Sequence, residues 1–109
     1  MAVASVGSGT QTATIDTEHT LDTETDAGVY VLVVDTSNMV DGDIVTFRIK
    51  TKYATGGTSR LAFSATYSNA QAELNKYSPP IPIDTEIICT LEQTDGTGRD
   101  FYWSLLKIS

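Results

Sequence analysis

Apolar and polar residues alternate along much of this chain with the two-residue period of a β-strand. The clearest example is the segment 44–53, in which Val45, Phe47 and Ile49 fall on one face and polar or basic residues on the other. The segment 60–68 alternates in the same way. This pattern predicts two half-buried strands, each with one face on a core and one face in solvent.

Further segments extend the β pattern. The run VYVLVV at 29–34 is the most apolar part of the chain, and its β-branched residues predict a central strand buried on both faces. Strands are also expected at 83–92 and at 100–108. The segment 13–25 is rich in threonine and poor in large apolar residues, which predicts an edge strand or a strand covered by a partner.

Turn-forming residues separate these strands and indicate the fold class. Gly56-Gly57 suits a tight hairpin turn, and the prolines within 78–82 keep that segment out of a central strand because proline donates no ladder hydrogen bond. Only 69–75 favours a helix. About six to eight strands separated by turns predict an all-β fold, an antiparallel β-sandwich of the jelly-roll or immunoglobulin-like kind. The Cys…Trp…Cys pattern of true immunoglobulin domains is missing, which favours the jelly roll.

The start of the chain differs from the rest. Residues 1–12, MAVASVGSGTQT, are small and mostly polar, which predicts a flexible N-terminal arm before a single β-sandwich domain at 13–109. A chain of 109 residues has the usual size of one domain. We expect no secretion signal and no membrane span, because no apolar run approaches the roughly 20 residues that a spanning helix needs.

Charge is distributed unevenly along the chain. The formal net charge is −7, which argues against nucleic acid as a partner because phosphate binding requires clustered Lys and Arg. Residues 1–43 carry eight acidic side chains and no Lys or Arg, whereas 44–76 carry five basic side chains and one acidic one. Either acidic strands pair with basic strands inside one domain, or one surface offers opposite charges to identical neighbours. The candidate interface residues of the second interpretation are Asp16, Glu18, Asp22, Glu24, Arg48, Lys50, Lys52 and Arg60.

Residues that could carry catalysis are few. His19 is the only histidine, and it has no serine or cysteine nucleophile beside it in sequence, so it is interpreted as a surface residue. The pairs Asp16/Glu18 and Asp22/Glu24 have i, i+2 spacing, which places both acids of a pair on one strand face. Two carboxylates can serve glycoside hydrolysis, but any acidic edge strand has this spacing. We therefore expect a protein that is not an enzyme.

Ligand sites are also weakly indicated. Asp35, Asn38, Asp41 and Asp43 are rich in oxygen, but they do not match the calcium-loop spacing and read better as a turn. Cys89, the only cysteine, excludes an intramolecular disulfide and is expected to be a small buried hydrophobe. No phosphate-binding loop occurs, and we expect no cofactor. The aromatic residues that could form a sugar-stacking platform are Tyr53, Tyr67, Tyr77, Tyr102 and Trp103.

The segment 34–108, and above all YSPPIPIDTEIICTLEQTDGTGRDFYWSLLKI within it, resembles the small single-domain β-sandwich virion proteins of tailed bacteriophages. Capsid decoration (cement) proteins are the most similar in character: a small-residue arm, a compact Thr-rich β domain, an acidic surface and one cysteine. The resemblance carries no motif with a defined role and assigns no functional residue.

This resemblance implies a protein of the capsid surface that binds the major capsid protein or another virion protein and forms a dimer or trimer of its own. It would stabilise the head lattice by protein–protein contacts, without nucleic acid, membrane or cofactor. A tail or baseplate component is a close variant. The alternative from the residues is a β-sandwich module that binds carbohydrate or another cell-surface ligand.

Overall fold

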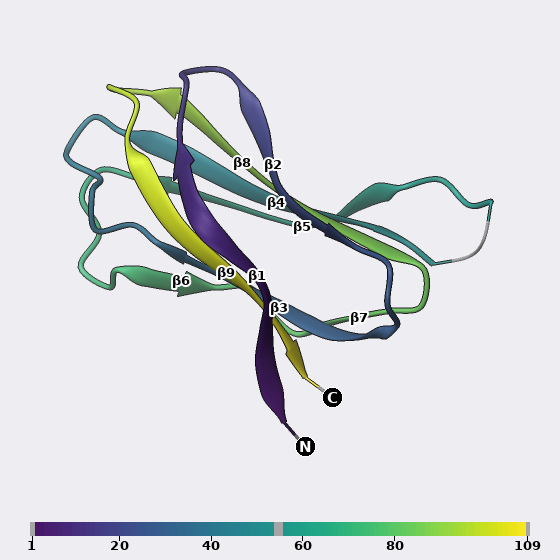
Figure 1. Cartoon of the computed structure of the whole chain (residues 1–109). Coiled ribbons are helices and arrows are strands. Elements are labelled where there is room, and N and C mark those ends of the chain that lie inside the picture. Colours follow the sequence, from purple (N-terminus) through teal and green to yellow (C-terminus); the bar gives the residue numbers. More distant parts are fainter. Residues whose placement is uncertain (1, 54–55, 109) are drawn as a thin grey trace.

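The protein consists of two antiparallel β-sheets packed face to face, which confirms the predicted all-β sandwich (Figure 1). The computed structural model describes residues 2–53 and 56–108. These residues include no helix long and apolar enough to cross a membrane. The strands are β1 (Val3–Thr12), β2 (Glu18–Glu24), β3 (Gly28–Asp35), β4 (Ile44–Lys52), β5 (Arg60–Ser68), β6 (Asn75–Tyr77), β7 (Ile81–Ile83), β8 (Glu86–Asp95) and β9 (Asp100–Ile108).

The strand order is that of a jelly roll. Sheet A has the order β1-β9-β3-β6, with β7 also paired to β3, and sheet B has the order β2-β8-β4-β5. The first strand therefore pairs with the last, the second with the next to last, and so on inward, as in one long hairpin wrapped into a sandwich. Successive pairs of this hairpin fall in opposite sheets, which resolves the sequence-based choice in favour of the jelly roll.

Strands β6 and β7 are two halves of one interrupted edge strand. Pro79 and Pro80 lie between them, and neither can donate a ladder hydrogen bond. Ser78 compensates on the N-terminal side, because its N–H donates to the Leu32 carbonyl (2.8 Å) and its Oγ accepts from the Leu32 N–H (2.9 Å). The expectation that 78–82 is not a central strand is confirmed. Residues 69–75, which favour a helix in sequence, instead bend and then enter β6.

Alternating side chains from both sheets fill the core. On β4, Val45, Phe47 and Ile49 are buried, as their spacing predicts, while Arg48 and Lys50 face outward. Cys89 is also buried, and burial raises the pKa of its thiol to about 12, so it behaves as the expected small hydrophobe. The buried apolar residues are Ala13, Tyr30, Leu32, Val34, Met39, Val45, Phe47, Ile49, Ile83, Ile87, Cys89, Leu91, Phe101 and Leu105.

The N-terminal segment is a strand, so the expectation of a flexible arm at 1–12 is wrong for residues 3–12. These residues form β1 and pair with β9 along its length, with one irregularity between Ser5 and Gly7. Gly9 lies opposite Trp103, and a Cβ on Gly9 would sit 3.6 Å from the indole nitrogen. The small residues of β1 therefore belong to a paired strand that lies against Trp103, and at Gly7 against the Asp22 side chain, so the boundary expected after residue 12 has no structural counterpart.

The corner between β1 and β2 is fixed by the loop between β8 and β9. The Ala13 N–H donates to the Arg99 carbonyl (2.9 Å), and the Asp16 N–H donates to the Gln93 carbonyl (2.8 Å). The fully buried Gln93 amide organises this loop, since Nε2 donates to the carbonyls of Asp95 (3.0 Å) and Thr97 (2.8 Å) and Oε1 accepts from the Arg99 N–H (3.0 Å). All polar atoms of this side chain are thus satisfied without water.

This corner predicts that Gly98→Ala destabilises the fold. A Cβ at position 98 would overlap the backbone carbonyl of Ala13, which cannot rotate away as a side chain can. We expect the free energy of unfolding to fall by about 1–3 kcal/mol in urea denaturation. The matched control is Gly9→Ala, whose new Cβ would make an ordinary contact with Trp103. A Gly98→Ala variant as stable as that control would contradict the described corner.

Candidate functional site

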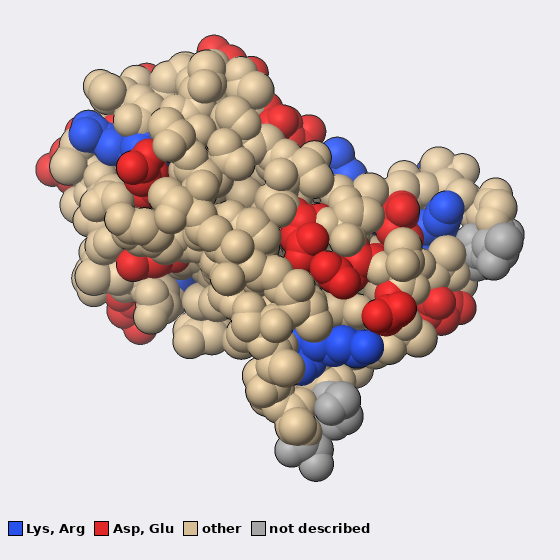
Figure 2. Space-filling view, viewed as in Figure 1, with Lys and Arg blue, Asp and Glu red and all other residues tan. Residues whose placement is uncertain are grey.

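The outer faces of the two sheets differ in chemical character. The outer face of sheet B, here called the ion-pair face, carries Glu18, Arg48, Lys50 and Glu92 among hydroxyl side chains. The outer face of sheet A presents mainly apolar and hydroxyl side chains. Figure 2 shows a broad area without charge over β1 and β9, with charged side chains gathered around its borders. Antiparallel sandwiches usually keep both outer faces polar, so the face of sheet A is the unusual one.

The ion-pair face satisfies its own charges. The Glu18 carboxylate accepts a hydrogen bond from the Thr90 hydroxyl (2.6 Å) and lies 3.4 Å from both Arg48 and Lys50. Arg48 also donates to Glu92 at 2.8 Å. The Thr90 hydroxyl, helped by Lys50 and Arg48, lowers the pKa of Glu18, and Glu92 raises the pKa of Arg48. Pairing of acidic with basic strands inside one domain therefore accounts for these charges.

The other candidate interface residues lie elsewhere. Lys52 is opposite Glu86 and Arg60 is opposite Thr51 at one end of sheet B. Asp16 is exposed in the corner before β2, where it adopts a left-handed φ of 63° that aspartate tolerates. The eight predicted residues are therefore not one patch, and their role in an interface remains a prediction.

Asp22 and Glu24 face the inside of the sandwich. An extra residue in β2 between Thr20 and Asp22 shifts the register, so that Asp22 lies opposite the buried Cys89 rather than on the outer face. Burial, Asp22 and Asp26 raise the pKa of Glu24, against the opposing effect of Lys107. One Asp22 oxygen, Oδ2, is buried without a donor among the described residues, and a protonated Glu24 is the neighbour that can supply one.

The candidate chemical groups are occupied by structural contacts. His19 accepts a hydrogen bond from the Thr14 N–H at Nε2 (3.0 Å). Asp43 is buried and accepts from Arg99 Nε (2.9 Å) and from the Val40 N–H (3.0 Å). Asp35 accepts from the Ser37 N–H of its own turn (2.8 Å), and Asp41 accepts from the Ala70 N–H in the segment after β5 (3.3 Å). Over residues 2–53 and 56–108, no group of three or more His, Cys, Asp or Glu side chains is placed to hold a metal ion.

The five aromatic residues do not form one platform. Tyr67 and Trp103 pack against the core. Tyr77 and Tyr102 are exposed on the outer face of sheet A, where they share a shallow depression of about 280 Å³ with Asp35 and Asn75. A sugar-binding site on this protein would therefore be built from the two exposed tyrosines, not from all five aromatic residues.

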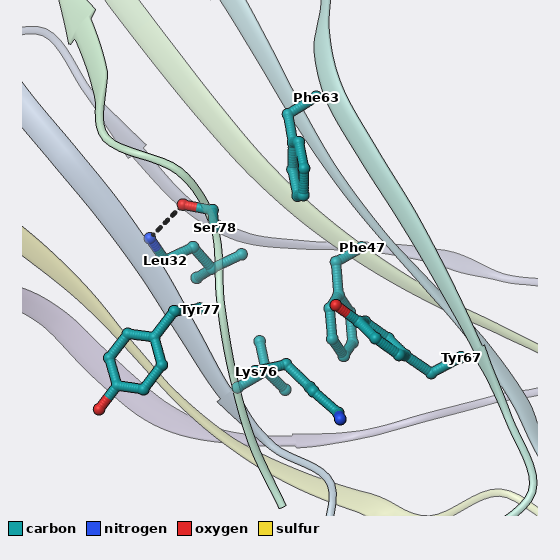
Figure 3. A pocket seen from close by; sticks show the side chains of 8 residues that line it. Leu32, Phe47, Phe63, Tyr67, Lys76, Tyr77 and Ser78 are labelled. Carbon is teal, nitrogen blue, oxygen red and sulfur yellow. Dashed lines mark hydrogen bonds between the residues drawn. The ribbon is translucent and has the colours of Figure 1, made fainter. Parts of the chain in front are cut away.

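A second hollow lies inside the sandwich between β3 and β5. Phe47, Phe63 and Tyr67 project into it from sheet B, and Ser78 closes it from sheet A, while the Tyr77 ring points away (Figure 3). The Lys76 ammonium lies 4.9 Å from the centroid of the Tyr67 ring, at the edge of this space. A volume of about 10 Å³ has room for roughly one water molecule, so this is a packing defect rather than a ligand site.

Sheet A carries apolar side chains on both sides. The inward residues of β3, Tyr30, Leu32 and Val34, are at most 3% exposed. Its outward valines are only half-buried. The sequence predicted burial of both faces, and the structure buries one of them. The register places outward residues of β1 and β9 beside these valines. The apolar face is defined by Val3, Val29, Val31, Val33, Leu106 and Ile108.

Sequence reasoning missed most of this face. Leu106 and Ile108 alternate with Leu105 and Lys107, a pattern that by itself does not say which side meets the core. Val3 lay in the segment read as an arm, and it is 61% exposed. The signal that could have identified the face was the unbroken VYVLVV run, because such a strand needs cover on both sides.

Comparisons with known proteins bear on the fold. No protein-family model matches the chain, and no curated protein matches it. A chain of a solved structure described as "Structure of infectious bursal disease virus Gt strain" is similar, with a TM-score of 0.50 and 17% sequence identity. The similarity covers 96% of this chain and 32% of that chain, so this protein spans about a third of the viral chain's length. At this identity the comparison shows a shared fold, one that occurs in a virus structure.

The pKa shifts of Glu18 and Glu24 predict opposite effects of pH on stability. The folded-state pKa of Glu18 lies below its ordinary 4.5, so its stabilising contribution is present above that value and is lost as pH falls through the folded-state pKa. The folded-state pKa of Glu24 lies above 4.5, so the native state holds that proton more tightly. Ionised Glu24 therefore costs stability, and the cost appears as pH rises from 4.5 through the raised value.

We accordingly expect Glu18→Gln to lower the free energy of unfolding at neutral pH by less than about 1 kcal/mol, since partly exposed ion pairs are weak. Glu24→Gln should raise it at neutral pH. Both differences from wild type should shrink as the solution is acidified, which urea denaturation over a pH series measures. A Glu24→Gln variant less stable than wild type at neutral pH would show that the Asp22–Glu24 repulsion is not as described.

Proposed function

We propose that this protein is a structural component of a virus particle, and that it acts as a capsid decoration (cement) protein. The apolar face is the observation that carries this proposal, because a sandwich that leaves such a face uncovered is suited to assembly into a larger structure, whether the subunit that covers it is a virion protein or another copy of this chain. The jelly-roll fold, which a chain in a virus structure shares, supports the same assignment. In this role the protein binds the major capsid protein, or another virion protein, at the surface of the capsid.

The proposed mechanism is mechanical rather than chemical. A decoration protein that binds the assembled lattice but not its separate subunits stabilises the assembled state by mass action. Burying a fully exposed Val or Leu side chain contributes about 1.5–3 kcal/mol, and a side chain that is already half-buried contributes less. No catalysis is required, and the carboxylates and His19 that could serve it already hold the fold together. The net charge of −7 makes nucleic acid an unsuitable partner.

Location within the particle distinguishes two versions of this proposal. A decoration protein occupies the head lattice in many symmetric copies, whereas a tail or baseplate component is present in few. The two roles place the same demands on this chain, namely a stable sandwich and a surface for subunit contacts. We favour the head because the chain offers broad flat contact area rather than an elongated fibre or a catalytic centre.

Mass spectrometry and electron cryomicroscopy of purified particles test this function. We expect the protein in stoichiometric amounts on the outer capsid surface. Particles that lack it should release their genome at a lower temperature, and adding back the purified protein should restore the wild-type value. Absence of the protein from purified particles would contradict the proposal, and a few copies confined to the tail would contradict the decoration role.

Carbohydrate binding is the second candidate, because Tyr77 and Tyr102 flank Asp35 and Asn75 in one depression. Exposed aromatic rings beside polar groups are typical of sugar sites. We expect no specific binding in a glycan array. The alternative predicts binding that Tyr102→Ala abolishes and that Tyr53→Ala, which removes an exposed tyrosine outside the depression, leaves unchanged.

A further inference from the structure

The apolar face has the composition of a protein interior. Five of its six residues lie on β3 and β9, the two central strands of sheet A, and all six are Val, Leu or Ile. The outward positions of the central strands β4 and β8 of sheet B carry Thr, Arg, Lys and Glu, with Ile44 and Ile88 as the apolar exceptions. Both sheets are antiparallel and equally available to solvent, so fold geometry does not explain the difference. Exposing such an apolar face to water is unfavourable in free energy, and burying it against another surface removes that penalty.

We propose that a second copy of this chain covers the apolar face, forming a two-fold symmetric dimer in which two sheets A pack face to face. Its place in a particle rests on the proposed function, whereas the dimer itself is a property of the purified protein. In the dimer the strand β3 is buried on both faces, as its sequence pattern requires. The four sheets then form a stack, with the two ion-pair faces outermost.

Charge favours a second copy as the occupant. In an interface around a two-fold axis, the same surface of both copies meets, so a charged patch near the axis faces a patch of the same charge on the other copy. The apolar face contains only Val, Leu and Ile. The acidic residues that share the outer face of sheet A with it, Asp35 and Asp100, lie at one end of that sheet. Two chains of net charge −7 can therefore meet at this face without opposing like charges across its centre.

The polar groups of this region also permit burial. The hydroxyls of Ser5 and Ser104 hydrogen-bond each other across β1 and β9 at 2.8 Å. The Thr12 hydroxyl donates to Asp100 at 2.7 Å. Because these four side chains have hydrogen-bond partners within their own sheet, a second apolar surface can cover them without breaking those bonds.

The size of the face suits a dimer. Strands of the length of β9 span about 30 Å, and four paired strands are about 19 Å wide, so sheet A offers roughly 600 Å² per copy. Two copies bury about 1,200 Å², which is at the lower end of the range for specific interfaces. We therefore expect a reversible dimer of micromolar affinity rather than an obligate one.

The position of the acids selects the orientation. Asp35 and Asp100 lie at one end of the face, whereas Val3, Val29 and Ile108 lie at the other. A two-fold axis in the plane of the interface and perpendicular to the strands places the acidic end of one copy over the apolar end of the other. The alternative axis, parallel to the strands, would oppose the acids of the two copies, and like charges across an interface are unfavourable.

Analytical ultracentrifugation of the full chain tests the dimer. We expect a concentration-dependent monomer–dimer equilibrium that tightens with added salt, because salt screens the repulsion between two acidic chains. Val31→Glu should weaken the dimer at least about 100-fold, since it places two unpaired carboxylates close to the axis. Ser64→Glu, an equally charged change on an exposed position of the ion-pair face, should leave it unchanged.

Chemical cross-linking provides a second readout if Val31→Glu fails to fold. Leu106→Cys should give a covalent dimer with a bismaleimide of about 10 Å reach, which is the spacing of packed sheets. Ser64→Cys and the wild-type chain, whose Cys89 is buried, should give none.

A chain that is monomeric at all concentrations overturns the proposal, as does a dimer that forms its cross-link through position 64 rather than 106. A dimer in solution together with absence from particles would overturn the proposed function and leave this interface standing.

Discussion

Strand β3 is apolar on both of its faces, and the rest of the structure depends on how those faces are covered. Its inward residues Tyr30, Leu32 and Val34 lie almost completely buried between the sheets. Its two edges are paired, by β9 on one side and by the interrupted strand β6–β7 on the other. The strand therefore fixes the middle of sheet A, and residues 2–53 and 56–108 contain no further element that covers its outward valines.

The polar residues, in contrast, are largely committed to the fold. Glu18, Arg48 and Lys50 pair with one another on the ion-pair face. Asp43 holds Arg99 beside the loop that Gln93 organises. These groups hold one another in place within the fold, and the proposed function rests on the surfaces of the protein rather than on them. The apolar face has no comparable internal partner among the described residues.

The alternation of apolar and polar residues, and the positions of the prolines, predicted those strands whose structure depends mainly on nearby residues. The alternation at 44–53 gave β4 and its buried face, and the prolines at 79 and 80 placed the adjacent strands at an edge. One feature depended on tertiary context and was therefore missed. The small residues of β1 resemble a mobile arm in sequence because their pairing with β9 is visible only once that strand lies beside them.

The candidate site was harder to predict than the fold. The i, i+2 spacing correctly placed Asp22 and Glu24 on one face, but the extra residue in β2 turns that face inward, and no sequence signal marks such a bulge. The charge blocks allowed two interpretations, and the ion pairs of Glu18, Arg48, Lys50 and Glu92 match the one in which acidic and basic strands pair inside one domain. The VYVLVV run is a strand, as predicted, but the predicted burial on both faces is met within the described chain on one face only.

The most direct test of this account is the solvent accessibility of the outward methyl groups, measured by NMR with a soluble paramagnetic probe over a range of protein concentrations. The account predicts that the methyl groups of Val29, Val31, Val33, Leu106 and Ile108 become protected together as concentration rises, while that of Leu61 on β5, which is 57% exposed, stays accessible. Methyl groups of the apolar face that remain accessible at every concentration would contradict it.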